Sequence, residues 1–122
     1  MEVNQNKLEE KSKVLGRAIG QTDAAKALAR SEKAIMEDEE TKELFEKVRQ
    51  AEQKLMKKVQ GGDEISEDEK EELRELSKKL EAKTVFQQFI AAQSNFEKVM
   101  REVNQHIQKG ISEGQNSKII QI

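Results

Sequence analysis

The last third of the chain carries its most regular repeat of apolar residues. Between Thr84 and Lys109, apolar side chains recur at alternating intervals of three and four residues, the spacing of a helix that packs along its whole length. One row runs Ala82, Phe89, Phe96 and Val103, and the other runs Phe86, Gln93, Met100 and Ile107. Further apolar residues between the rows widen this stripe, so the pattern predicts a central helix with several helical neighbours.

Shorter stripes of apolar residues, also at helical spacing, precede this helix in the sequence. They predict four helices, over about 6–20, 23–36, 39–60 and 67–82. The first carries Leu8, Val14, Leu15, Ala18 and Ile19 on one side, and the third carries Leu44, Phe45, Val48, Ala51, Leu55, Met56 and Val59. The fourth has only a single row of leucines at 73, 76 and 80, which is typical of an outer helix.

The helix boundaries must come from glycines and capping residues, because the chain contains no proline. Asn6, Thr22 and Asp38 are the expected N-caps of the first three helices. Gly61 and Gly62 end the third helix, and the segment 66–69 fits the capping box S-x-x-E, so helices three and four form an antiparallel hairpin. Thr84 with Gln87 repeats the capping-box pattern and favours a break before the last helix.

These elements predict an all-α fold: a helical bundle with a central helical hairpin and a long C-terminal helix. We expect a single helical domain over 1–109. The tail 110–122, GISEGQNSKIIQI, is rich in glycine and polar residues, and it is predicted to be mobile. Whether its isoleucines dock on a neighbour is left open by the pattern.

The composition indicates a thin hydrophobic core. Apolar residues make up 34% of the chain, or about 39% with the glycines, below the roughly 45–50% typical of globular domains. A small domain also buries a smaller fraction of its surface than a large one. We therefore expect the bundle to be completed by a second copy, as a homodimer or a higher homo-oligomer, or by another protein, as in a regulatory complex.

The charge pattern narrows the classes of partner. The net charge is −2, with basic and acidic residues mixed along the chain, which disfavours a nucleic-acid footprint. No apolar run approaches the roughly 20 residues that span a bilayer, and the first residues lack the features of a signal peptide. The sequence therefore predicts a cytoplasmic protein without membrane contact.

No constellation of catalytic residues stands out. His106 is the only histidine, and it lacks a nucleophile or metal partner at a defined spacing. The acidic runs 37–40 and 67–72 are better explained as helix starts than as metal sites, because they lack the alternating ligands of a calcium loop. The chain has no cysteine. We therefore predict no enzymatic activity and no catalytic, cofactor-binding or metal site.

The charges of the hairpin form the candidate interaction surface. Lysines gather near the end of helix three and on the facing helix, close to an acidic run. The surface consists of Lys54, Lys57, Lys58, Glu71, Glu72, Lys78 and Lys79. Such a surface suits protein–protein docking, and the alternative is RNA binding through the lysines. RNA binding is the weaker hypothesis because the hairpin has no exposed aromatic residues for base stacking.

The segment from Ala34 to Ile111 resembles the YlbF/YmcA family of small bacterial helical proteins, and it is nearest to the YheA-like members. The resemblance rests on the acidic entry at 37–40, Phe45, the glycine turn with Ser66, and above all the last helix. In that helix the matching residues are Phe86, Phe89, Ala92, Gln93, Phe96, Met100, Glu102, Val103, Asn104 and Ile107. These are packing positions, so they bear on fold more than on function.

The resemblance implies a self-associating, non-enzymatic interaction module. Some family members act as accessory subunits of a complex that adjusts RNA processing and development, and that complex can carry iron–sulfur clusters ligated by cysteine. Because this chain has no cysteine, cluster binding does not carry over to it. The residues assigned to core or oligomer packing are Phe45, Phe86, Phe89, Phe96, Met100, Val103 and Ile107.

Overall fold

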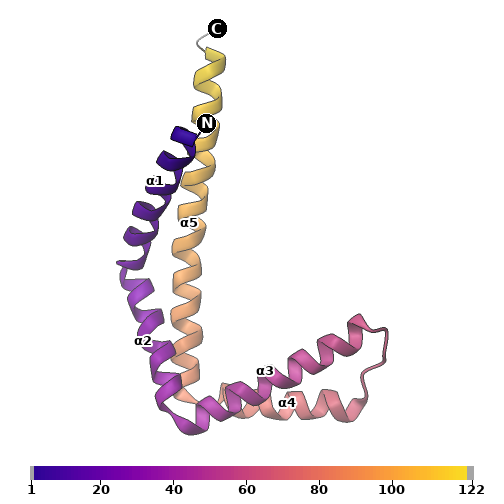
Figure 1. Ribbon diagram of the computed structural model, residues 1–122. Coiled ribbons are helices and arrows are strands. Elements are labelled where there is room, and N and C mark those ends of the chain that lie inside the picture. Colours follow the sequence, from indigo (N-terminus) through magenta and orange to yellow (C-terminus); the bar gives the residue numbers. More distant parts are fainter. Residues whose placement is uncertain (1, 121–122) are drawn as a thin grey trace. The chain divides into compact units, whose positions relative to one another are not determined.

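The computed structural model describes residues 2–120, and over that range it contains helices and turns but no strand. The helices are α1 (Glu2–Gly20), α2 (Asp23–Glu37), α3 (Glu39–Gln60), α4 (Glu67–Glu81) and α5 (Thr84–Ile120) (Figure 1). The predicted all-α class, with a helical hairpin and a long C-terminal helix, is confirmed. Within this range no helix combines the length and the apolar character needed to cross a membrane.

The chain divides into two compact units. One takes in the residues up to Lys26 and those from Ala92 onward, and the other consists of Ala27–Ala91. The second unit holds most of α2, the α3–α4 hairpin and the first two turns of α5. The expectation of a single domain over 1–109 with a mobile tail stays a prediction.

Two of the predicted N-caps bond as expected. The Thr22 hydroxyl oxygen accepts from the Ala25 amide at 3.2 Å, and the Asp38 carboxylate accepts from the Thr41 amide at 3.4 Å. Each bond satisfies an amide that the first turn of a helix leaves without a backbone partner. The breaks before α2 and α3 are therefore local consequences of the sequence.

The turn between α3 and α4 is fixed at both of its ends. The Gly62 amide donates to the Val59 carbonyl and the Asp63 amide to the Lys58 carbonyl, a Schellman arrangement in which Gly62 has a φ of +79°. On the other side, Ser66 and Glu69 form the predicted capping box. This turn sends α4 back along α3, and the two helices pack side by side (Figure 1).

Helix α1 begins earlier and helix α5 ends later than the sequence pattern indicated. Asn6 was expected to cap α1, but α1 starts at Glu2, since nothing between these residues interrupts a helix. Helix α5 continues past Lys109 to Ile120, through Gly110 and Gly114. A glycine weakens a helix by about 1 kcal/mol but ends it only where the backbone turns left-handed, and neither of these glycines has a positive φ.

The break between α4 and α5 is present, but it is not capped as predicted. Helix α4 ends at Glu81 and α5 starts at Thr84, so Thr84 is the first helical residue rather than the N-cap. The Gln87 side-chain amide donates to the Glu81 carbonyl at 2.9 Å instead of closing a capping box. Gln87 therefore ties the start of α5 to the end of α4.

The core of the second unit lies where α2, α3, α4 and the start of α5 meet. Its most buried side chains are Ile35, Thr41, Val48 and Leu80, with Thr41 completely inaccessible. Phe45 of α3 contacts Phe86 and Phe89 of α5, with ring centroids 6.3 Å apart in both pairs. Of the described residues of α5, only Ala92 is buried.

Candidate interaction surface

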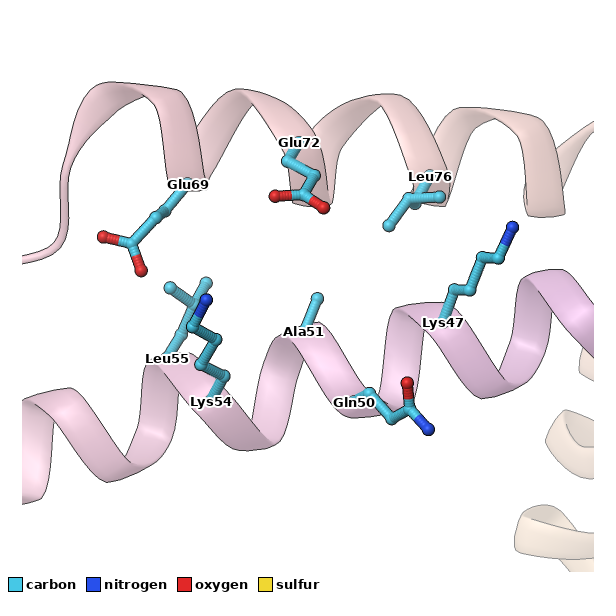
Figure 2. Close-up of a pocket in the computed structure, with 8 residues that line it drawn as sticks. All are labelled: Lys47, Gln50, Ala51, Lys54, Leu55, Glu69, Glu72 and Leu76. Carbon is cyan, nitrogen blue, oxygen red and sulfur yellow. The ribbon is translucent and has the colours of Figure 1, made fainter.

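An open groove runs between the two helices of the hairpin (Figure 2). Its floor is apolar, formed by Ala51, Leu55 and Leu76. Its lining also includes Lys47, Gln50 and Lys54 on α3 and Glu69 and Glu72 on α4. Figure 2 shows the two glutamates projecting from α4 toward α3, across the groove from Lys54. The groove is thus an apolar strip flanked by charges of both signs.

The tip of the hairpin, which we define as the end beside residues 61–65, is held by an ion pair. Lys58 Nζ lies 2.6 Å from Glu69 Oε2, and the two side chains are 34% and 19% exposed. Glu69 Oε1 accepts from the amide and the hydroxyl of Ser66. The Lys58 ammonium first, and then these Ser66 donors, lower the pKa of Glu69 from 4.5 to about 2.

The opposite end, which we call the base, has a matching ion pair. Lys83 Nζ, just beyond α4, lies 2.6 Å from Glu40 Oε1 in the first turn of α3. A second groove lies beside this pair, lined by Glu40, Glu43, Leu44, Lys47, Lys79, Ala82 and Lys83. Because Lys47 lines both grooves, we treat them as one face of the hairpin and call it the hairpin face.

The hairpin face contains some of the predicted surface residues and not others. Lys54, Glu72 and Lys79 line it. Lys58 is held by Glu69 at the tip, and Glu71 pairs with Arg74 on α4. Lys57 and Lys78 are exposed but line neither groove. Three of the seven residues thus line the hairpin face, and the interaction surface itself stays a prediction.

Sequence reasoning missed Glu43 and Lys47 as members of this face. Lys47 precedes Lys54 by seven residues, and Glu43 precedes it by eleven, so all three lie on one side of a helix. That spacing was a usable signal.

The residues considered for catalysis or metal binding lie on different helices. His106 and Glu102 are exposed on α5. In the acidic run 37–40, Asp38 is the N-cap of α3, and Glu39 and Glu40 lie in its first turn. In the part of the chain that the structure describes, no three residues of the types His, Cys, Asp and Glu gather as metal ligands would.

The predicted packing residues fall into two groups. Phe45, Phe86 and Phe89 form the aromatic cluster of the second unit. On the continuation of α5, Phe96, Met100 and Val103 are half-buried, and Ile107 is 41% exposed. The three rings of the first group contact one another, with centroids 6.1–6.3 Å apart.

Helix α1 leaves most of its apolar side uncovered. Leu8 is 67% exposed, Val14 54% and Leu15 39%. In the same compact unit, Ile107 and Ile111 of α5 are 41% and 48% exposed. Large apolar side chains at this exposure on one unit are typical of a surface that another helix covers.

Taken together, this is a small helical protein whose surface offers apolar strips bordered by charges. The chain belongs to the family described as "Control of competence regulator ComK, YlbF/YmcA", whose sequence model matches residues 8–112. The resemblance found in the last helix is thereby confirmed, and the family is a regulatory one by this description.

Individual relatives agree with this assignment. The UPF0342 protein SSP0954 of Staphylococcus saprophyticus is 29% identical over 99 residues, which cover 81% of this chain and 87% of the relative. The UPF0342 protein SERP1381 of Staphylococcus epidermidis is 27% identical over the same shares. These names describe no activity, so the relatives extend the family without adding a function.

Two solved structures share the fold. A protein of unknown function (DUF964) from Bacillus stearothermophilus superposes with a TM-score of 0.70 at 23% identity, covering 87% of this chain and 93% of that one. A chain of the crystal structure of Bacillus subtilis RicA in complex with RicF gives a TM-score of 0.70 at 21% identity, covering 88% and 95%. At these identities the likeness shows the fold alone.

Proposed function

We propose that the protein is a non-enzymatic interaction module that self-associates and serves as a subunit of a regulatory assembly. The observation that carries this proposal is the uncovered apolar side of α1, where Leu8, Val14 and Leu15 are 39–67% exposed. A helix that keeps such a stripe in water gains little from folding onto its own chain. Burial against another helix contributes about 25 cal/mol for each Å² of apolar surface covered.

A second copy is the partner that this surface fits best. Ile107 and Ile111 of α5 belong to the same compact unit and are also exposed, so each copy offers apolar surface on two helices. Two such units can cover one another about a two-fold axis, which is the commonest way for soluble chains to associate. The low apolar content of the chain supports the same conclusion.

The regulatory part of the proposal rests on the family. Its description names control of a competence regulator, and RicA, a protein of the structure with a similar fold, is described in complex with RicF. We propose by analogy that this chain, too, acts by binding proteins, as an accessory subunit in RNA processing or development. A location in the cytoplasm stays a prediction.

RNA binding through the hairpin has less support. The lysines of the hairpin face alternate with glutamates, and Lys58 and Lys83 are already held in ion pairs. An electrostatic RNA surface needs uncompensated positive charge along the path of the phosphates. Titration of a fluorescent single-stranded RNA at about 50 mM salt tests this alternative, and the interaction-module proposal expects no saturable binding.

Sedimentation velocity at micromolar concentration tests the proposal directly. The parent is expected to sediment as a species larger than the 14.0 kDa chain. Val14→Glu places a charge in the uncovered stripe and should shift the distribution toward smaller species. Met56→Glu, at a residue that is 62% exposed in the other unit, is the matched control and should behave as the parent. A parent that sediments as a monomer would refute self-association.

His106→Gln tests the non-enzymatic part. The imidazole is exposed, and no partner with a catalytic or metal-binding geometry accompanies it in the described part of the chain. The variant should keep the oligomeric state and rescue a deletion strain as well as the parent does. Loss of rescue by a folded, oligomeric His106→Gln protein would show that the imidazole performs chemistry.

A further inference from the structure

Five charged side chains of the hairpin face have no ion-pair partner among the described residues: Lys47, which lines both grooves, and four others. Lys54 and Glu72 line the groove on its tip side, and Glu43 and Lys79 line it near the base. All four are exposed. The ion pairs of the hairpin use other residues, among them Lys58 with Glu69 and Lys83 with Glu40, so these four charges remain available to a partner.

The signs of these charges alternate around the face. The two ion pairs at the ends set the register of the hairpin, and the residues midway between them are Arg49 on α3 and Leu76 on α4. On the tip side, α3 carries a positive charge and α4 a negative one. On the base side, Glu43 of α3 is negative and Lys79 of α4 is positive, and the further Lys47 of α3 lies about half a turn from the midpoint. Like charges therefore occupy diagonally opposite corners of the apolar strip.

We propose that the hairpin face binds the hairpin face of a second copy, tip over base, around a two-fold axis that crosses the face at the level of Arg49 and Leu76. In this alignment Lys54 of each copy faces Glu43 of the other copy, and Glu72 faces Lys79. The two-fold axis repeats each contact, which gives four complementary charge pairs around the apolar floor. The proposal rests on the self-association proposed above, but it uses a surface separate from the apolar side of α1.

The alternative lengthwise alignment, tip over tip, is less favourable because of Lys47. Lys47 and Lys79 line the same base groove, at about the same level on the two helices. Tip over tip would place each helix α3 against helix α4 of the other copy and would bring these lysines together. Tip over base instead places Lys47 opposite Ala51 of the second copy, about one helical turn from the Lys47 of that copy, so a single pair of like charges lies near the axis instead of two Lys47–Lys79 pairs.

Packing supports the same arrangement. Ala51, Leu55 and Leu76 form an apolar floor that is open to solvent in one chain. Two hairpins laid face to face make four helices in which every neighbour is antiparallel, the arrangement of a simple four-helix bundle. The small Ala51 near the centre allows the two copies of α3 to approach closely.

Charge reversal with complementation between two variants tests this interface. Lys54→Glu and Glu43→Lys are made separately, and each alone should weaken the contact about tenfold, because both symmetry-related pairs become repulsive. An equimolar mixture should restore association, since Glu at position 54 then meets Lys at position 43. Lys57→Glu, on the same helix but outside both grooves, is the control and should sediment as the parent. Restored association cannot come from misfolded chains, so it would support the proposal.

The other outcomes overturn it. Unchanged sedimentation of Lys54→Glu and Glu43→Lys would show that this face is not an interface, even if Val14→Glu still disrupts the assembly and self-association stands. Restoration by mixing Lys54→Glu with Glu72→Lys, instead of with Glu43→Lys, would show the tip-over-tip alignment. Binding of a single-stranded RNA probe that Lys54→Glu abolishes, with association unchanged, would assign the face to RNA.

Discussion

Lys58 Nζ and Glu69 Oε2 lie 2.6 Å apart and join the last turn of α3 to the first turn of α4 across the tip of the hairpin. Glu69 is at the same time the N3 residue of the capping box that starts α4. One carboxylate thus links the local helix start to the tertiary contact between the arms. This link lies at the tip, where the Gly62 turn sends α4 back along α3.

The lowered pKa of Glu69 predicts a defined dependence of stability on pH. The pKa is about 2 in the folded protein and 4.5 as its ordinary value. The carboxylate therefore stabilises the fold fully above pH 4.5, and this contribution is lost as the pH falls toward 2. Glu69→Gln should lower the melting temperature near neutral pH, and the difference from the parent should shrink on acidification.

Glu75→Gln is the matched control for this measurement. Glu75 is exposed on the same helix and has no ion-pair partner among the described residues, so its removal should leave the pH profile of melting unchanged. A constant difference between parent and Glu69→Gln from about pH 6 to about pH 2 would contradict the role assigned to the ion pair.

Gly62→Val should destabilise the hairpin turn. Gly62 has a φ of +79°, where a side chain costs about 1–2 kcal/mol, and more if it is β-branched. Chemical denaturation gives the loss directly. Gly16→Ala is the control: a methyl group there meets open space inside α1, so it should stabilise by about 0.5–1 kcal/mol. Equal midpoints for parent and Gly62→Val would place the turn elsewhere.

Thr41→Val should leave the free energy of unfolding unchanged or raise it by up to about 1 kcal/mol. Thr41 is completely buried, and its hydroxyl has no hydrogen-bond partner in the described part of the chain. Replacing such a hydroxyl by a methyl group of the same shape removes an unsatisfied polar atom. Thr41→Ser, which keeps the hydroxyl and loses a methyl group, should cost about 1 kcal/mol. The opposite order in urea denaturation would show that the hydroxyl has a partner.

Phe45→Ala should be among the more destabilising substitutions in the second unit. It removes the ring that contacts both Phe86 and Phe89. Truncation of a buried phenylalanine costs about 3–5 kcal/mol, and the lower end applies because Phe45 is half-buried. Met56→Ala on the same helix, where the side chain is 62% exposed, should cost well under half as much. A Phe45→Ala protein that unfolds at the parent's midpoint would exclude the aromatic cluster as a core.

Local signals in the sequence located most of the fold. The caps at Thr22, Asp38 and Ser66 and the glycine turn act within a few residues of themselves, so neighbouring side chains suffice to predict them. These local signals did not locate the helix ends where the sequence contains no strong stop signal. The pattern predicts that the last helix ends before Gly110, yet the helix runs through it, because glycine only weakens a helix.

The sequence by itself determined the helices, the hairpin and the apolar stripes, because these follow from backbone bonding and from periodicity along one segment. Only the tertiary structure decided which charges face one another. Lys58 meets Glu69 and Lys83 meets Glu40 through the antiparallel packing of two helices, and Lys54, Glu72, Glu43 and Lys79 are left unpaired by the same register. Such pairings depend on distances between segments far apart in the chain, which no local pattern encodes.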